Sequence, residues 1–126
     1  MKELFDVHCH MVPGVDDGAA DLEESLEMLK MQHEDGVRKI IITPHYRRRM
    51  FETPAKKVHE QFLKLQEAAK KEYPDMSLYL GCELHSNMDL QDILEKRKYV
   101  TMAGSSYVLL EFSEGDSAQH IRERVY

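Results

Sequence analysis

Short apolar runs alternate along the chain with longer amphipathic stretches. The run at residues 37–43 is nearly continuous and rich in β-branched side chains, as in a parallel strand covered on both faces. The amphipathic stretches repeat apolar residues at intervals of three and four, the period of a helix with one buried face. The pattern predicts strands at residues 3–8, 37–43, 78–82 and 107–112, and helices at residues 20–35, 54–73, 90–97 and from 117 onward.

Two of the predicted helices carry signals at their ends and along one face. The first ends at Gly36, and its apolar stripe is Leu22, Leu26 and Leu29. The second is expected to begin with Thr53 as its N-cap and Pro54 at its first helical position. Its buried stripe consists of Ala55, Val58, Phe62, Leu65 and Ala69.

Strands that alternate with helices imply an α/β fold with a parallel sheet, which is either an open doubly wound sheet or a closed barrel. Polar residues follow every predicted strand, and a barrel would gather these strand ends around one axis, which favours the barrel. An eight-stranded barrel takes about 250 residues. We therefore expect one domain over residues 1–126 that supplies about the first four βα units of a barrel.

Histidines and carboxylates stand at the ends of these strands. His8 and His10 alternate along the first strand, so we expect both side chains on one face, and Asp16 and Asp17 follow at a turn. The later strands are followed by His45, Glu83 and Glu111. A carboxylate directly after a buried strand is costly unless it is paired or binds a metal. The nearby histidines favour a metal over a lysine or arginine partner.

Imidazole and carboxylate ligands suit zinc, manganese or iron, and the absence of cysteine ligands argues against a structural zinc site. Glu83 and Glu111 are able to bridge two ions, as a hydrolase needs for holding a phosphoryl group and lowering the pKa of a water. Asp6 shares the strand face of His8 and His10. Two roles stay open for it, because it could orient a histidine ring or accept hydrogen bonds from backbone amides.

The other histidines receive no place among the ligands. His85 lies two residues beyond Glu83, and we expect it at the solvent or the substrate rim. For the remaining ones, which lie in predicted helices, we expect positions at the surface or at the edge of a stripe: His33, His59 and His120.

The segment after His45 is the most basic part of the chain, with three arginines followed by Met50 and Phe51. Guanidinium groups and an aromatic ring at this rim would match a phosphorylated aromatic side chain. Arg47 and Arg48 lie nearer to His45 and are the favoured substrate-binding residues. A solvated loop without a specific role is an equally weighted alternative.

Composition excludes several classes of partner. The 126 residues carry a formal charge of −6 without a long basic block, so nucleic acid is not expected as a partner. No apolar run has the length of a signal segment or a membrane span, so we expect a cytoplasmic protein without membrane insertion. Cys9 and Cys82 lack metal-site spacing and are expected to be reduced and buried.

Four motifs together resemble a known family: DVHCHMVPGVDDGA, TPHYRRRMFETP, LGCEL and LLEF. The chain is similar to the metal-dependent protein-tyrosine phosphatases of the polymerase and histidinol phosphatase (PHP) superfamily, which regulate bacterial capsule and exopolysaccharide. The resemblance implies a distorted (β/α)7 barrel with three metal ions, usually manganese, whose bound hydroxide attacks phosphotyrosine on a bacterial tyrosine kinase. It implies catalytic roles for Asp17 and His45, and the implied metal ligands are His8, His10, Asp17, His45, Glu83 and Glu111.

The family pattern also includes a later histidine, an Asp-x-His motif and phosphate-binding arginines, and this sequence stops before them at Tyr126. We therefore expect a C-terminally truncated domain whose activity alone is in question. Its open sheet edge predicts low solubility or assembly with a second copy. Two other functions stay open: a different PHP phosphoesterase, such as a histidinol-phosphate phosphatase, and a non-catalytic fragment or interaction module.

Overall fold

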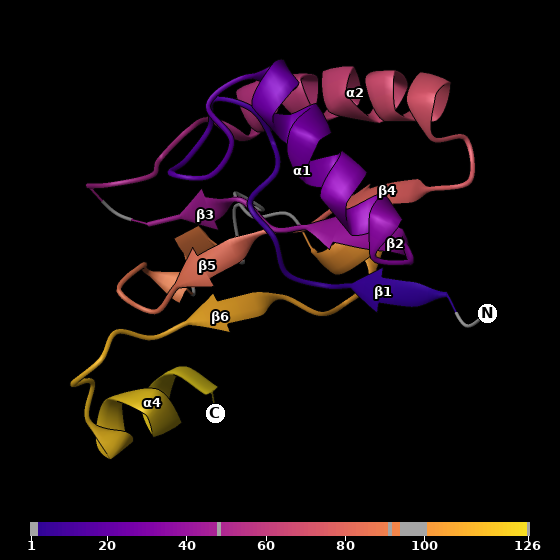
Figure 1. Cartoon of the computed structure of the whole chain (residues 1–126). Helices are drawn as coiled ribbons and strands as arrows, with labels where there is room; N and C mark the ends of the chain where they lie inside the picture. The colour runs from indigo at the N-terminus through magenta and orange to yellow at the C-terminus, as the bar shows by residue number, and fades with distance from the viewer. Residues whose placement is uncertain (1–2, 48, 91, 94–100, 126) are drawn as a thin grey trace.

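The structure is a computed structural model, and it describes residues 3–47, 49–90, 92–93 and 101–125 (Figure 1). The elements follow one another in the order β1 (Leu4–Asp6), α1 (Leu22–Glu34), β2 (Val37–Ile42), β3 (His45–Tyr46), α2 (Ala55–Glu72), β4 (Ser77–Leu80), β5 (Glu83–His85), the 3-10 helix η1 (Met102–Gly104), β6 (Leu109–Glu111) and α4 (Ala118–Val125). The helix expected at residues 90–97 lies mostly outside the described residues. All four predicted strands and the other three helices are present, with shorter strands than expected.

The strands form two small parallel sheets, with the orders β1-β2-β4 and β3-β5-β6. Each of the two middle predicted strands is followed by a short strand that the sequence did not predict: β3 follows β2 after Thr43 and Pro44, and β5 follows β4 after Gly81 and Cys82. Pro44 has no backbone N–H for a sheet ladder. Across the break, Gly81 N–H donates to the Ile42 carbonyl at 2.8 Å and Glu83 N–H to the Pro44 carbonyl at 2.9 Å.

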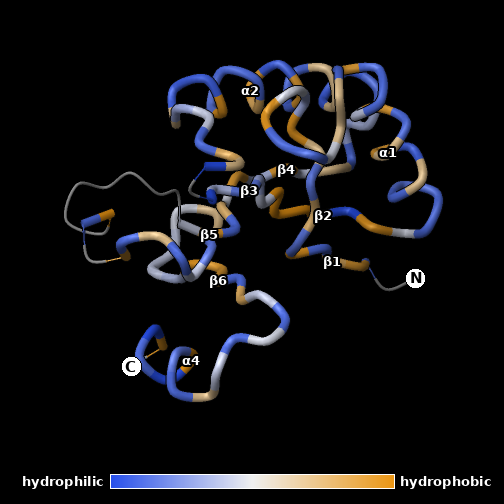
Figure 2. Tube along the Cα trace, turned by 90° about the vertical axis from the view of Figure 1, so that its left-hand side faces the viewer, coloured by the Kyte–Doolittle hydropathy of each residue, from blue (hydrophilic) through white to orange (hydrophobic). Residues whose placement is uncertain are grey.

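These contacts join the two sheets into one curved layer in which the strands follow one another in chain order. The order shows no reversal among the described strands, and a reversal is what marks a doubly wound sheet. Helices α1 and α2 pack against each other and lie on the same side of this layer, whereas α4 lies apart from both (Figures 1 and 2). The chain therefore winds in one direction, as a singly wound βα arrangement does.

The core lies between this layer and the two helices. Ile40 and Ile42 of β2 are fully buried, and hydrophobic segments concentrate in β2 and β4 (Figure 2). The predicted stripe of α2 is confirmed except at its first position, since Ala55 is exposed. The stripe residues that are buried are Val58, Phe62, Leu65 and Ala69.

Two details of the helix predictions are wrong. Leu22 is 36% exposed, and Ser25 is buried on α1, where its hydroxyl donates to the Met11 carbonyl at 2.6 Å. Thr53 does not cap α2, because its hydroxyl donates to the Val15 carbonyl at 2.9 Å. Both hydroxyls bind the loop that follows β1, so tertiary contacts with this loop outweigh the local helix signals.

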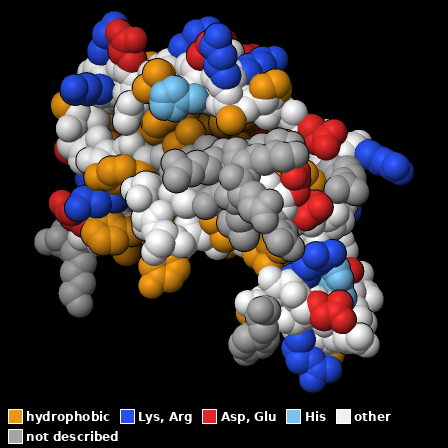
Figure 3. Space-filling model, turned by 180° about the vertical axis from the view of Figure 1, so that it is seen from behind, with side chains coloured by type: hydrophobic (Ala, Val, Ile, Leu, Met, Phe, Trp, Pro, Cys, Tyr) orange, Lys and Arg blue, Asp and Glu red, His pale blue; other side chains and the backbone are white. Residues whose placement is uncertain are grey.

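The opposite face of the first sheet is only partly covered in the described part of the chain, where Met102 of η1 lies beside Gly81 at the end of β4. Phe5 pairs with Lys39, and Lys39 pairs with Ser77, so these residues and Tyr79 share one face. Phe5 is 62% exposed and Tyr79 40% exposed. From behind, hydrophobic side chains reach the surface at several points (Figure 3).

Two further sequence expectations concern the membrane and the thiols. Among the described residues, no helix is long and apolar enough to cross a membrane. Neither Cys9 nor Cys82 forms a disulfide, as expected for reduced thiols; Cys82 is buried and Cys9 is partly buried. Burial, with the nearby charges of Asp6 and Asp16, raises the pKa of the Cys9 thiol from 9.0 to about 12.

Candidate metal centre

The candidate ligands lie around the boundary between the first sheet and the second. His8 and His10 follow β1, His45 begins β3, Glu83 begins β5, and Glu111 ends β6. In the parallel pairing of β3 with β5, His45 is the direct partner of Glu83. The parallel pairings of β3 with β5 and of β5 with β6 bring residues from four separate parts of the chain together at this boundary.

Glu83 is the centre of this group. Its side chain is only 7% exposed, and its Oε1 lies 3.2 Å from His8 Nε2. Its Oε2 lies 3.0 Å from His10 Nε2 and 3.1 Å from His45 Nδ1. One buried carboxylate therefore faces three imidazole rings.

Glu111 and Asp17 approach the same group from His45. Glu111 Oε1 lies 3.8 Å from His45 Nδ1, and Asp17 Oδ1 lies 3.5 Å from His45 Nε2. Asp17 is the most accessible member, with 64% of its side chain exposed. All six residues predicted as ligands therefore lie in one cluster.

The donor atoms fit a metal ion better than they fit each other. His8, His10 and Glu83 each offer one ligand atom within 4.8 Å of the others, and so do His45, Glu83 and Glu111. Among the described residues, three buried polar side-chain atoms have no hydrogen-bond partner, and all belong to this cluster: His45 Nδ1, Glu83 Oε2 and Glu111 Oε1. Leaving such atoms unpaired costs about 1–3 kcal/mol each, whereas a cation would bind all three. The donor set therefore fits the metal that the sequence predicts.

Asp16 is the functional candidate that the sequence analysis noted in the turn but did not assign. Its side chain is 1% exposed, and its Oδ2 lies 3.1 Å from His10 Nδ1. It also accepts backbone hydrogen bonds from His45 at 3.0 Å and Gly18 at 2.9 Å. The sequence signal was the Asp-Asp pair, which does not distinguish the exposed carboxylate from the buried one.

The bond between Asp16 and His10 changes the acidity of both groups. Burial raises the pKa of the Asp16 carboxyl, but the bonds from His10, His45 and Gly18 outweigh burial and hold it below its ordinary 3.8. The Asp16 hydrogen bond raises the pKa of His10 above 6.5, although burial opposes this effect. Asp16 is therefore a carboxylate at neutral pH and acts only as an acceptor.

Of the two roles left open for Asp6, the structure shows that it accepts a hydrogen bond from a backbone amide and does not orient a histidine ring. Its Oδ1 accepts from the His8 backbone N–H at 3.0 Å, and its Oδ2 accepts from Gln32 Nε2 at 2.6 Å. It contacts the backbone of His8 and the side chain of Gln32 on α1, and no imidazole ring. Asp6 therefore anchors the end of β1 to α1.

The solvent position expected for His85 is wrong. His85 is 3% exposed, its Nδ1 accepts from the Asn87 N–H at 3.0 Å, and its Nε2 lies 2.9 Å from Ser113 Oγ. The residue is the strand partner of Glu111, with its Nε2 3.9 Å from Glu111 Oε1. Burial of β5 on both sides explains the difference, since every residue of this short strand is buried.

The remaining histidines lie away from the cluster. His59 is exposed on α2, and His33 at the end of α1 binds Asp75 at 3.0 Å. His120 is partly buried at the start of α4, where its Nε2 lies 3.2 Å from the buried Ser86 hydroxyl. The expectation of a position at the surface or at the edge of a stripe is confirmed, since His59 is exposed and His33 and His120 are partly exposed.

The basic segment after His45 forms a tight turn at the rim. Arg47 and Phe51 exchange two backbone hydrogen bonds of 2.9 Å, which brings Phe51 back over the cluster. Its ring stacks on His45 with 5.3 Å between centroids, and His45 stacks on His10 at 4.2 Å. Arg47 is half-buried beside this stack, and Arg48 lies outside the described residues.

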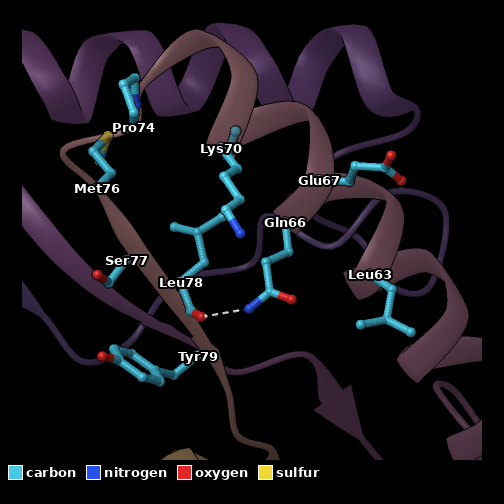
Figure 4. Close-up of a pocket in the computed structure, with 10 residues that line it drawn as sticks. Leu63, Gln66, Glu67, Lys70, Pro74, Met76, Ser77, Leu78 and Tyr79 are labelled. Carbon is cyan, nitrogen blue, oxygen red and sulfur yellow. Dashed lines mark hydrogen bonds between the residues drawn. The ribbon is translucent and has the colours of Figure 1, made fainter.

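A cavity of about 660 Å³ lies elsewhere, between α2 and β4 (Figure 4). Its lining includes Leu63, Lys70 and Tyr79, and Gln66 donates to the Leu78 carbonyl across it at 3.2 Å. None of its lining residues is a candidate ligand. The candidate metal cluster is therefore separate from this cavity.

Residues 4–126 match the family described as "Capsular polysaccharide synthesis, CpsB/CapC". Over 118 residues the chain is 40% identical to the tyrosine-protein phosphatase CpsB of Streptococcus pneumoniae, covering 94% of this chain and 49% of that protein. Over 109 residues it is 31% identical to the tyrosine-protein phosphatase YwqE of Bacillus subtilis strain 168, covering 86% and 43%. The resemblance predicted from the motifs is confirmed.

A solved structure is also similar, with a TM-score of 0.84 and 28% identity, and it covers 95% of this chain and 49% of that chain. It belongs to the crystal structures of YwqE from Bacillus subtilis and CpsB from Streptococcus pneumoniae, described as unique metal-dependent tyrosine phosphatases. This chain spans about half the length of the curated relatives it matches.

Proposed function

Since this chain belongs to the CpsB/CapC family of capsular polysaccharide synthesis, we propose that it carries the metal site of a metal-dependent phosphotyrosine-protein phosphatase. One observation carries the proposal: three histidine nitrogens lie within 3.2 Å of the Glu83 carboxylate, while Glu83 Oε2 has no hydrogen-bond partner. Relatives are named tyrosine-protein phosphatases, which supports phosphotyrosine as the substrate group.

In this proposal the cluster holds two ions that share Glu83. His8 and His10 complete the first group, and His45 and Glu111 complete the second. Asp17 faces His45 Nε2 and leaves Nδ1 directed at the two glutamates. When bound, the ions supply Lewis acidity, which lowers the pKa of a water and neutralises phosphoryl charge. Manganese is the proposed metal, up to three ions in a complete site, with zinc and iron as alternatives that suit the same donors.

The turn beside His45 is the proposed substrate rim. Phe51 supplies an aromatic surface next to the cluster, and Arg47 and Arg48 supply the charge that a phosphoryl group needs. The proposed substrate is a phosphotyrosine protein, namely a bacterial tyrosine autokinase of capsule synthesis in the cytoplasm. The family description and the basic rim favour it over histidinol phosphate.

We further propose that the four βα units belong to a distorted (β/α)7 barrel of the PHP type. The chain-order strands and the helices on one side support this architecture. The face that carries Phe5 and Tyr79 would then be the barrel interior, and a second copy of the chain could cover it.

Metal binding and phosphatase activity are tested separately. The chain is purified without metal and titrated with Mn²⁺, Zn²⁺ and Fe²⁺ by calorimetry, and crystals grown with each metal are examined by anomalous scattering. We expect ions at about 2.0–2.3 Å from His8, His10, Glu83 and Glu111. An absence of ions near these side chains would contradict the metal site.

Hydrolysis of a phosphotyrosine peptide is then compared with hydrolysis of histidinol phosphate in the presence of the metal that binds. We expect the peptide to be the better substrate. A preference for histidinol phosphate would favour the other phosphoesterase, and metal binding without hydrolysis would favour a non-catalytic module.

A further inference from the structure

We propose that Asp16 is a positioning residue. Its carboxylate holds His10 so that the Nε2 lone pair points into the proposed metal site, and it also ties His10 to the strand that begins with His45. The proposal rests on the proposed metal site but not on the phosphatase reaction. Asp16 is not in the predicted ligand set, and its carboxylate does not face Glu83 or Glu111 in any described contact. It acts through the histidines.

The Asp16 carboxylate joins three segments of the chain. Its Oδ2 receives His10 Nδ1 at 3.1 Å and the His45 backbone N–H at 3.0 Å, and its Oδ1 receives the Gly18 N–H at 2.9 Å. His45 is 29 residues away along the chain. One buried side chain therefore sets the distance between two histidines whose rings stack at 4.2 Å.

The contact also selects the tautomer of His10. A carboxylate only accepts hydrogen bonds, so His10 must carry its proton on Nδ1 when the ring is neutral. Nε2 then presents a lone pair, and this atom lies 3.0 Å from Glu83 Oε2. Two lone pairs at this distance repel each other, whereas a cation between them would bind both.

The local backbone prevents Asp16 from moving away. A Cβ atom added at Gly18 would lie 2.1 Å from the His10 carbonyl oxygen and 2.6 Å from His10 Cβ. The same carbonyl accepts the Ala19 N–H at 3.1 Å. The turn after Asp16 therefore packs directly on the His10 backbone, which the absence of a side chain at Gly18 permits.

Asp16→Asn is the direct test, because an asparagine has only one acceptor oxygen. Its single oxygen can replace Oδ2, which accepts from His10 and His45, or Oδ1, which accepts from Gly18, but it cannot replace both. Asp6→Asn is the matched control, because it removes the same charge near the same histidines from a residue that contacts no imidazole ring. Both variants are made in the full 126-residue chain.

The first readout is the tautomer of His10 in metal-free protein, measured by nitrogen-15 NMR at a pH where the ring is neutral. We expect the proton on Nδ1 in the wild type and in Asp6→Asn, and a mixture of tautomers in Asp16→Asn. A wild-type ring with its proton on Nε2 would overturn the proposal, even if Asp16→Asn does not fold.

The second readout is the affinity for Mn²⁺, measured by calorimetry on folded protein. Loss of a residue that orients a metal-binding histidine typically weakens binding by about 10–100-fold, and we expect this for Asp16→Asn. Asp6→Asn should stay within about twofold of the wild type, because it lacks this contact. Equal affinity in the wild type and Asp16→Asn would overturn the positioning role. If the wild type itself bound no metal, the proposed function would fail, while the NMR result would still decide the role of Asp16.

Discussion

The two sheets of this molecule differ in what they bury. The sheet β1-β2-β4 buries apolar side chains such as Ile40 and Leu78 beneath two helices. The sheet β3-β5-β6 buries Glu83 and His85 on either side of the apolar Leu84, and the buried Ser86 follows directly. The second sheet continues two strands of the first after short breaks, so the same strands change from apolar to polar along their length.

This difference separates stability from chemistry within a strand. Apolar burial stabilises the first sheet by roughly 25 cal/mol per Å² of buried surface. The second sheet contains buried polar atoms without hydrogen-bond partners, which lower stability unless a ligand binds them. Substitutions in the first sheet should therefore affect folding, and substitutions in the second should affect metal binding.

The largest effect is expected for Glu83→Gln, which keeps the shape of the side chain and removes the charge that the two proposed ion sites share. We expect Mn²⁺ affinity to fall at least about 100-fold and any phosphatase turnover by orders of magnitude, with the metal-free fold kept. Calorimetry and thermal unfolding measure both quantities. Glu60→Gln, an exposed change on α2, is the control, and near-normal affinity of Glu83→Gln would contradict the shared site.

For Ile40→Ala in the first sheet, we expect a loss of folding stability and no change in metal affinity. Ile40 is fully buried, and its truncation should lower the free energy of unfolding by roughly 2–5 kcal/mol. Chemical denaturation measures this loss. The neighbouring Lys39→Ala, which removes an ammonium group 5.3 Å from the Phe5 ring, should cost at most about 1 kcal/mol. A change in the intrinsic metal affinity of folded Ile40→Ala protein would show that the two sheets are not separable in this way.

A smaller effect is expected for the open face of the first sheet. If a second copy covers this face, Phe5→Ser and Tyr79→Ser should each weaken self-association, because apolar surface that would be buried is lost. Light scattering over a range of protein concentrations measures the association. Met31→Ser removes a residue that is 65% exposed on α1 and should leave the association unchanged. A wild-type chain that is monomeric at all concentrations would contradict this prediction.

The smallest effect is expected for Asp75→Asn, an exposed residue that contacts His33 and Arg38 and none of the candidate ligands. The His33 hydrogen bond holds the pKa of Asp75 below its ordinary 3.8, aided by Arg38. A lowered pKa stabilises the fold above about 3.8, and this contribution disappears as pH falls through the folded-state value. The wild type should therefore unfold at a slightly higher temperature than Asp75→Asn at pH 7, and the difference should vanish in acid. A difference that persists at the lowest pH would exclude this ion pair as its cause.

Periodicity and residue type predicted three helices and four strands that the structure describes, and the histidines and carboxylates that meet beside them. The α2 stripe from Val58 to Ala69 reports burial directly, because a helix exposes one face at a fixed interval. The candidate ligands could be predicted because each follows an apolar run, and parallel strands end at one edge. These residues are His8, His10, His45, Glu83 and Glu111. These properties are local, and a single sequence contains them.

Contacts between distant segments were decided only by the tertiary structure. Asp6 and Asp16 have the same side chain and both accept backbone hydrogen bonds, yet only Asp16 also binds an imidazole ring. The Thr53 hydroxyl does not cap α2, because it donates to the Val15 carbonyl, 38 residues away along the chain. Such choices depend on which donors and acceptors packing brings within about 3 Å, and no periodic pattern along the chain records that distance.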